Sequence, residues 1–160
     1  MIIINQGVKQ MKKDALSYIG ELKNILEDLC YDDLRLFLQI IFDTYTRGHQ
    51  IFIFGNGGSA ATALHFTCDI NKGLAKGSRK RFKVICLNEN ISTITAYAND
   101  MAFEDIFVEQ LKNFLQKGDL VIGISSSGTP KMFLSLLLTQ IKREQLHLGL
   151  RDLMAGSSKN

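Results

Sequence analysis

Two short loops carry the residue types best suited to holding a phosphate group. They are Gly55-Asn56-Gly57-Gly58-Ser59 and Ser125-Ser126-Ser127-Gly128. Each loop directly follows a short apolar run, 51–54 or 120–124. If both runs are buried strands, the loops place backbone N–H groups and small hydroxyls where the next helix begins, which favours anion binding. Together the two loops predict a phosphosugar site.

Each loop also has a purely structural interpretation. The first is typical of a tight turn between a strand and a helix, and the second of a serine that caps the following helix. Three adjacent hydroxyls exceed what capping requires. Neither loop has the lysine of a nucleotide P-loop or the glycine spacing of a dinucleotide fold, so nucleotide binding is disfavoured.

A second candidate is the pair His65 and Asp69, which follows the first loop. Their i, i+4 spacing on a predicted helix stacks them on one face. Such an imidazole and carboxylate can share a metal ion or divide acid and base work. The alternative is an ordinary hydrogen bond on the helix surface. Asn99 and Asp100 are a third polar candidate, and by themselves they are typical of a helix end.

The first 48 residues predict two helices joined by a turn, a helical hairpin. Apolar side chains recur at helical spacing between Met11 and Leu29, and a second helix can begin after Asp32 and stop at Gly48. The second helix carries more apolar surface than one packing seam needs. We therefore expect a homo-oligomer.

The elements that position the loops follow an α/β pattern. Three unalternated apolar runs, 51–54, 84–87 and 120–124, are separated by segments of helix length. This pattern predicts a doubly wound parallel sheet flanked by helices in three layers, with ligands bound beyond the carboxyl ends of its strands. We expect one domain over 1–160, comprising the hairpin 1–48, an α/β core 49–128 and a tail 129–160.

Composition excludes several other classes of protein. The net charge of +3 over 160 residues is too small to indicate nucleic-acid binding, and the basic cluster at 76–83 is typical of a solvated loop. No run approaches the roughly 18 apolar residues of a membrane-spanning helix. The three cysteines are scattered without metal-type spacing. We expect reduced thiols and a cytoplasmic location, with neither nucleic acid nor membrane as a partner.

Four motifs in order resemble the phosphoheptose isomerases of the sugar isomerase (SIS) superfamily. They are Gly55 to Ser59, Ala63-Leu64-His65-Phe66, Asn99-Asp100 and Ile124 to Gly128. The resemblance covers about residues 10 to 128. It implies the SIS fold and a homotetramer. It also implies an enzyme that interconverts sedoheptulose 7-phosphate and a heptose 7-phosphate through an enediol, for bacterial surface polysaccharide and lipopolysaccharide synthesis.

The resemblance also implies roles for individual residues. The loop Asn56, Gly57, Gly58 and Ser59 would contact the sugar, Ser125, Ser126 and Ser127 the phosphate, and Asn99 and Asp100 the substrate hydroxyls. His65 and Asp69 would be catalytic and would bind zinc, one ion per subunit. The family usually has glutamate at the position of Asp69, and the shorter carboxylate must sit closer to the substrate proton. A misplacement of about 1 Å can cost about a hundredfold in rate.

The tail 129–160 departs from the family. Back-translation with one added nucleotide after Gly128 restores a continuation like that of the family, so we expect this tail to be out-of-frame translation. The family's C-terminal helix, which supplies a further histidine and a metal-binding glutamine, would then be missing. Apolar content still permits a helix over 133–138 and an edge strand over 146–150. The alternative function is a non-catalytic SIS module that binds a phosphosugar or a protein, of the replication-initiator-associating type.

Overall fold

The computed structural model describes residues 2–74, 77, 80–125 and 146–149. In chain order, the elements are α1 (Ile2–Glu27), α2 (Tyr31–Arg47), β1 (Ile51–Gly55), α3 (Gly58–Cys68), a π-helical turn (Asp69–Gly73), β2 (Val84–Cys86), α4 (Ile91–Asp100), a 3-10 turn (Phe103–Asp105), α5 (Ile106–Phe114), β3 (Leu120–Ile124) and β4 (Leu146–Gly149).

The strands form one parallel sheet in the order β2-β1-β3-β4. The three predicted core strands are confirmed, although β2 ends at Cys86, one residue earlier than expected. The expected edge strand is also present, because β4 pairs with β3 from Leu120↔Leu146 onward. The predicted helix over 133–138 lies outside the described residues.

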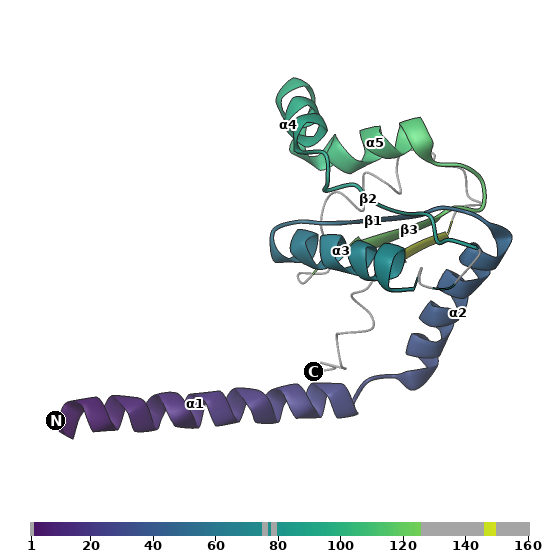
Figure 1. The fold of residues 1–160 in the computed structure, drawn as a ribbon. Coiled ribbons are helices and arrows are strands. Elements are labelled where there is room, and N and C mark those ends of the chain that lie inside the picture. Colours follow the sequence, from purple (N-terminus) through teal and green to yellow (C-terminus); the bar gives the residue numbers. More distant parts are fainter. Residues whose placement is uncertain (1, 75–76, 78–79, 126–145, 150–160) are drawn as a thin grey trace, which may run out of the picture.

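Helices cover both faces of the sheet, as Figure 1 shows, with α3 on one side and α4 and α5 on the other. Successive residues of β1 therefore enter different cores. Ile51 and Ile53 pack in the cluster that includes residues of α2 and α3. Phe52 and Phe54 pack against α5, where the Phe54 and Phe107 rings are 4.5 Å apart. Burial on both faces explains why the strand sequences do not alternate.

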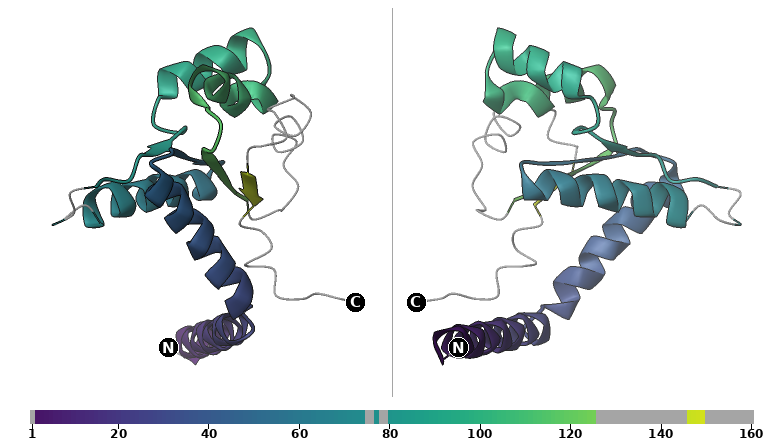
Figure 2. Two further views of the ribbon diagram at one scale, coloured as in Figure 1. Left: turned by 90° about the vertical axis from the view of Figure 1, so that its right-hand side faces the viewer. Right: turned by 60° about the vertical axis from the view of Figure 1, so that its left-hand side comes forward.

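The two predicted N-terminal helices are present, joined by a short turn. Gly48 ends α2 in the left-handed conformation at φ 79°, as expected of a C-terminal glycine. Helix α1 extends away from the sheet (Figures 1 and 2). Within the described residues, no helix combines the length and apolar composition needed to cross a bilayer.

Two lysines of the basic cluster are more than solvated charges, which the sequence did not reveal. Lys80 Nζ donates to the Thr46 carbonyl (2.5 Å), and Lys83 Nζ donates to the Gly48 carbonyl (2.9 Å). Lys80 also lies 5.2 Å from the centre of the Tyr45 ring. Both cations therefore stabilise the carboxyl end of α2, where carbonyl groups lack helical partners and the dipole is negative.

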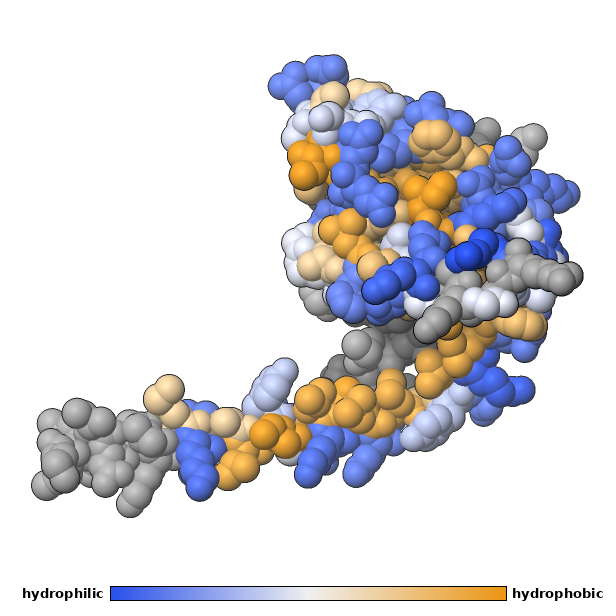
Figure 3. Space-filling view, in the orientation of Figure 1, coloured by the Kyte–Doolittle hydropathy of each residue, from blue (hydrophilic) through white to orange (hydrophobic). Residues whose placement is uncertain are grey.

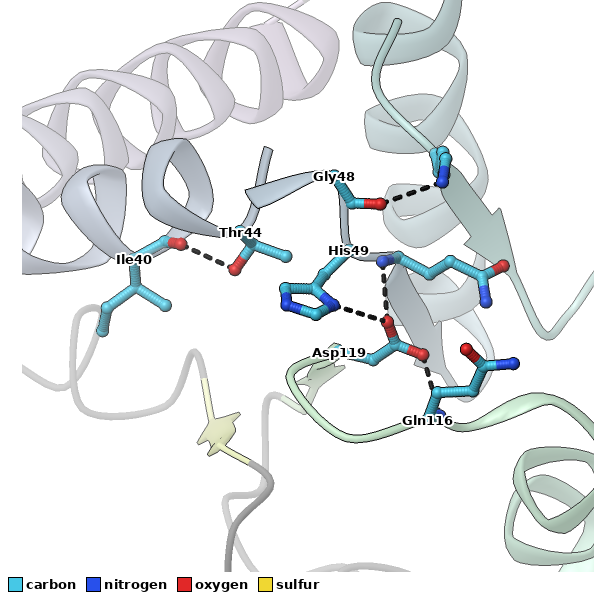
Figure 4. A network of polar contacts seen from close by, with 8 residues as sticks. Ile40, Thr44, Gly48, His49, Gln116 and Asp119 are labelled. Atoms are coloured by element: carbon cyan, nitrogen blue, oxygen red, sulfur yellow. Dashed lines mark hydrogen bonds and ion pairs between the residues drawn. The ribbon is translucent and has the colours of Figure 1, made fainter. Parts of the chain in front are cut away.

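A buried carboxylate ties together the amino ends of β1 and β3 (Figure 4). Asp119, whose side chain is 2% exposed, accepts hydrogen bonds from the Gln50 N–H (2.8 Å) and the Gln116 N–H (2.9 Å). The His49 ring lies against the same carboxylate and leaves no room for a Cβ at Gly118. The turns that precede the two strands are thereby held at a fixed spacing.

Candidate functional site

The glycine loop 55–59 joins the end of β1 directly to the start of α3. Gly57 has φ +54°, a conformation that L side chains rarely adopt. At Gly55 an added Cβ would lie 2.7 Å from the backbone carbon of Ser59. The Ser59 and Ala60 N–H groups donate to the Asn56 and Gly57 carbonyls (3.0 and 3.1 Å), and the positive end of the helix dipole lies at this turn. This turn therefore requires glycine for its shape and suits an anion by its position.

We expect Gly55→Ala to destabilise the chain by about 1–3 kcal/mol, because the new methyl group would overlap backbone atoms. Gly58→Ala is the matched control: its Cβ would meet nothing within 4 Å and its φ is unstrained. Chemical denaturation of the two variants checks the difference. Equal stability for both would show that the close approach of β1 and α3 is not required.

The strand order places Ser125, the first residue of the second loop, beside the first loop. Gly55 pairs with Ile124, so Ser125 follows β3 at the edge of the sheet where Asn56 follows β1. The chain moves from β1 to β2 on one side and then returns to β3 on the other. Such a switch in direction opens a crevice outside the carboxyl ends of the two strands. Ser126 and Ser127 lie outside the described residues.

His65 and Asp69 meet as their spacing predicted. His65 Nδ1 lies 2.9 Å from Asp69 Oδ2, and the two side chains are 80% and 66% exposed. His65 lies on α3, and Asp69 begins the π-helical turn that follows it. This contact is the ordinary hydrogen bond on the helix surface that the sequence analysis gave as the alternative to a functional pair. It leaves both groups accessible to a ligand, and their catalytic role stays a prediction.

Zinc at a catalytic site takes three protein ligands and a water molecule. His65 and Asp69 are donors of the right type, but the described part of the chain contains no cluster of three or more His, Cys, Asp and Glu side chains. The described residues alone therefore do not make a zinc site.

Asn99 and Asp100 are the last two residues of α4, on the opposite face of the sheet from α3 (Figure 1). Asn99 Nδ2 donates to Asp100 Oδ1 (2.8 Å), and both side chains are exposed. The helix ends at this pair, as the structural interpretation predicted. Contact with substrate hydroxyls stays a prediction for both residues.

Two side chains near the loops were missed by sequence reasoning. Asn88 bonds both backbone groups of Gly55, at 3.0 and 2.9 Å. Gln110 is buried and donates to the Leu87 carbonyl (3.2 Å) and the Ile106 carbonyl (2.9 Å). No local signal in the sequence marked Asn88: it is the register that pairs Ile51 with Val84 that brings residue 88 level with Gly55. That register is known only once the strands are paired.

Cys86 lies in β2 below this loop, and burial raises the pKa of its thiol above the ordinary 9.0. A raised pKa favours the neutral thiol in the folded state, so the folded state loses stability as the pH rises beyond 9.0, where the unfolded chain ionises more readily. Cys30 and Cys68 are exposed. At pH 8 we expect a thiol reagent to modify these two rapidly and Cys86 only after denaturation, as mass spectrometry would show. Rapid labelling of Cys86 would contradict the packing around β2.

Comparison with known proteins agrees with this architecture. The sequence pattern of the SIS domain family matches residues 17–145. A phosphoheptose isomerase of Helicobacter pylori is 38% identical over 121 residues, which are 76% of this chain and 62% of that protein. The Campylobacter concisus phosphoheptose isomerase is 38% identical over 117 residues, 73% of this chain and 61% of its own. The chain thus spans less than two thirds of the length of these relatives.

Two solved structures share the fold. A phosphoheptose isomerase from Neisseria gonorrhoeae superposes with a TM-score of 0.77 at 22% identity, covering 88% of this chain and 74% of that one. A phosphoheptose isomerase from Francisella tularensis superposes with a TM-score of 0.78 at 22% identity, covering 90% and 74%. With the family pattern matched over most of its length, the chain belongs to the SIS domain family.

Proposed function

We propose that this chain binds a phosphosugar in the crevice outside the carboxyl ends of β1 and β3. We propose further that it belongs to an isomerase that interconverts sedoheptulose 7-phosphate and a heptose 7-phosphate. The observation that supports this most is the arrangement of two small-residue loops on adjacent parallel strands, β1 and β3. The choice of substrate rests on the relatives that are named phosphoheptose isomerase. The product would serve bacterial surface polysaccharide synthesis.

Phosphate binding fixes the register of the substrate in this proposal. The hydroxyls of Ser125, Ser126 and Ser127 hold the phosphate, and the start of α3 contributes its partial positive charge. The exposed loop residues Asn56, Gly57 and Gly58, with Ser59, hold the sugar, and Asn99 and Asp100 bind its hydroxyls. All of these groups are neutral except Asp100. The substrate's negative charge is therefore met by hydrogen-bond donors.

Proton transfer then needs one base and one orienting group. Asp69 takes the proton from the carbon next to the carbonyl while the carbonyl oxygen takes a proton from solvent, which gives an enediol. Asp69 then returns its proton to the former carbonyl carbon, and the hydroxyl on the other carbon releases its proton to solvent and becomes the new carbonyl. His65, 2.9 Å from the carboxylate, orients Asp69. The exposure of both side chains leaves the carboxylate accessible to substrate in this arrangement.

Zinc binding, one ion per subunit, is a separate proposal. It is supported by the donor types of His65 and Asp69. Further ligands would have to come from residues outside the described part of the chain or from another subunit. Elemental analysis of the purified protein tests it, since a zinc content near one per subunit that falls in His65→Ala is expected. Full zinc content in that variant would contradict the assignment.

A homo-oligomer, with a tetramer as the expected form, completes the proposal. Seven large apolar residues of α1 are exposed: Met11, Leu16, Tyr18, Ile19, Leu22, Ile25 and Leu26. Figure 3 shows the apolar side chains gathered along this helix and continuing onto α2. A single helix with an uncovered apolar face gains little stability alone, because helical stability in proteins comes mainly from packing that face. A second copy would cover the α1 face.

The free cysteines also support a cytoplasmic protein.

The variant Leu22→Asp/Leu26→Asp should dissociate the oligomer, because two charges would have to be buried in an apolar contact. Light scattering coupled to size exclusion measures the mass. Lys23→Asp, on the same helix with the same new side chain, should leave the mass unchanged. A monomeric wild-type chain would contradict the oligomer.

The experiment that tests the function measures isomerisation of sedoheptulose 7-phosphate by NMR and its binding by calorimetry. The chain as given is compared with a version whose reading frame is restored after Gly128. Turnover in either form supports the isomerase. Binding without turnover in both forms indicates the non-catalytic module, and the absence of binding in both overturns the proposal.

A further inference from the structure

One side chain holds the backbone of Gly55, where β1 ends and the loop 55–59 begins. The Gly55 N–H donates to Asn88 Oδ1 (3.0 Å), and Asn88 Nδ2 donates to the Gly55 carbonyl (2.9 Å). Because a backbone N–H only donates and a carbonyl only accepts, these two bonds fix which way the amide faces. Cys86 Sγ lies 3.8 Å from the same Oδ1 and presents a second donor to it.

The need for Asn88 comes from the way β2 leaves β1. The hydrogen-bond ladder between β1 and β2 begins where the Ile51 N–H donates to the Lys83 carbonyl (2.9 Å). It ends where the Leu87 N–H donates to the Ile53 carbonyl (2.9 Å). Beyond this point the Leu87 carbonyl accepts from Gln110 of α5 instead (3.2 Å). The Asn88 side chain supplies the donor and acceptor that a continued strand would have offered to Gly55. The strands can therefore separate without leaving buried backbone groups unpaired.

Gly55 transmits this restraint to the loop. It is buried and so close to the first turn of α3 that even a Cβ would overlap Ser59. The orientation of its peptide groups therefore sets the path of Asn56 and Gly57, which are exposed at the crevice. If the restraint is lost, the path of the loop depends on the bonds within the turn itself, such as that from the Ser59 N–H to the Asn56 carbonyl (3.0 Å).

We propose that Asn88 is a positioning residue for the loop 55–59, acting through Gly55 without touching the ligand. The part of this inference that concerns ligand affinity rests on the proposed function. The part that concerns the order of the loop does not. The two parts have separate measurements, so failure of one is distinguishable from failure of the other.

The first measurement is amide hydrogen exchange by NMR on the full chain. In Asn88→Ala the Gly55 N–H loses its acceptor, and its exchange should become about tenfold faster relative to the amides of β3, the order expected for one hydrogen bond. The second is calorimetric titration with sedoheptulose 7-phosphate, for which affinity should fall about tenfold. Circular dichroism establishes that the variant is folded.

Asn71 offers a matched control at the other end of β2. Its Nδ2 donates to the Val84 carbonyl (2.8 Å), and its Oδ1 accepts from the Val84 N–H (3.4 Å). Asn71→Ala therefore removes the same pair of backbone contacts from the same sheet, away from the loop. It should accelerate exchange at Val84, leave Gly55 protected and leave the affinity unchanged.

A milder variant covers the case in which Asn88→Ala does not fold. Asn88→Asp keeps the acceptor for the Gly55 N–H but faces the Gly55 carbonyl with an oxygen, so exchange at Gly55 should be intermediate. Unchanged Gly55 exchange in both variants would refute the restraint. Fast exchange with unchanged affinity, or equal loss of affinity in Asn71→Ala, would refute positioning. A wild-type chain that does not bind the sugar phosphate would refute the proposed function, and exchange would still decide the role of Asn88 in ordering the loop.

Discussion

Replacing Asp69 by asparagine should lower the rate of sedoheptulose 7-phosphate isomerisation about 10²–10⁴-fold, the usual contribution of a general base. Asparagine has nearly the same size and can still bond His65, but its amide cannot accept the substrate proton. The affinity for the sugar phosphate should change little, because the loops at β1 and β3 hold the substrate. NMR detection of solvent deuterium incorporated at the reacting carbon measures the proton transfer directly.

Two further measurements keep this prediction specific. The thermal stability of Asp69→Asn should match that of the wild type, because the side chain is 66% exposed. Asp69→Glu restores the family's usual carboxylate and should keep or raise the rate. If Asp69→Asn retained the wild-type rate of deuterium incorporation, Asp69 would not be the base.

Replacing Asp119 by alanine should cost about 1–3 kcal/mol of unfolding free energy, because two part-buried backbone donors lose their acceptor. The Gln50 and Gln116 N–H groups both depend on this carboxylate. Urea denaturation followed by circular dichroism gives the change.

The neutral variant Asp119→Asn should lose less, since its carbonyl oxygen still accepts one of the two bonds. Asp33→Ala removes a carboxylate of the same type from an exposed position at the start of α2, where its interaction with the helix dipole contributes at most about 1 kcal/mol. A loss for Asp119→Ala no larger than for Asp33→Ala would mean that water replaces the carboxylate fully.

The strands and the contact between His65 and Asp69 were predictable because they depend on residues close in sequence. A strand buried on both faces must be apolar throughout, which marked 51–54, 84–87 and 120–124 directly. The His65–Asp69 contact follows from the i, i+4 geometry of any helix. The C-terminal glycine of α2 was predictable for the same reason, since a left-handed helix end favours glycine.

Contacts between distant residues were not predictable in the same way. Asn88 lies 33 positions from Gly55, and Asp119 lies 69 positions from Gln50. Both side chains are of types that occur mostly in exposed turns. Their roles arise where strands begin or separate, and any of several polar residues nearby could have been brought to those places. The lysines that cap α2 belong to the same class of long-range contact.

The sequence by itself determined that two loops of small residues end two buried strands, because strand burial and turn geometry are local properties. Only the tertiary structure decided that the ends of these two strands are neighbours, because the order β2-β1-β3-β4 places β3 directly beside β1. That order depends on how the helices between the strands pack on opposite faces of the sheet. The tertiary structure also decided that β2 leaves β1 before Gly55, where Asn88 supplies the two bonds, since a strand that continued alongside β1 would have bonded Gly55 through its own backbone.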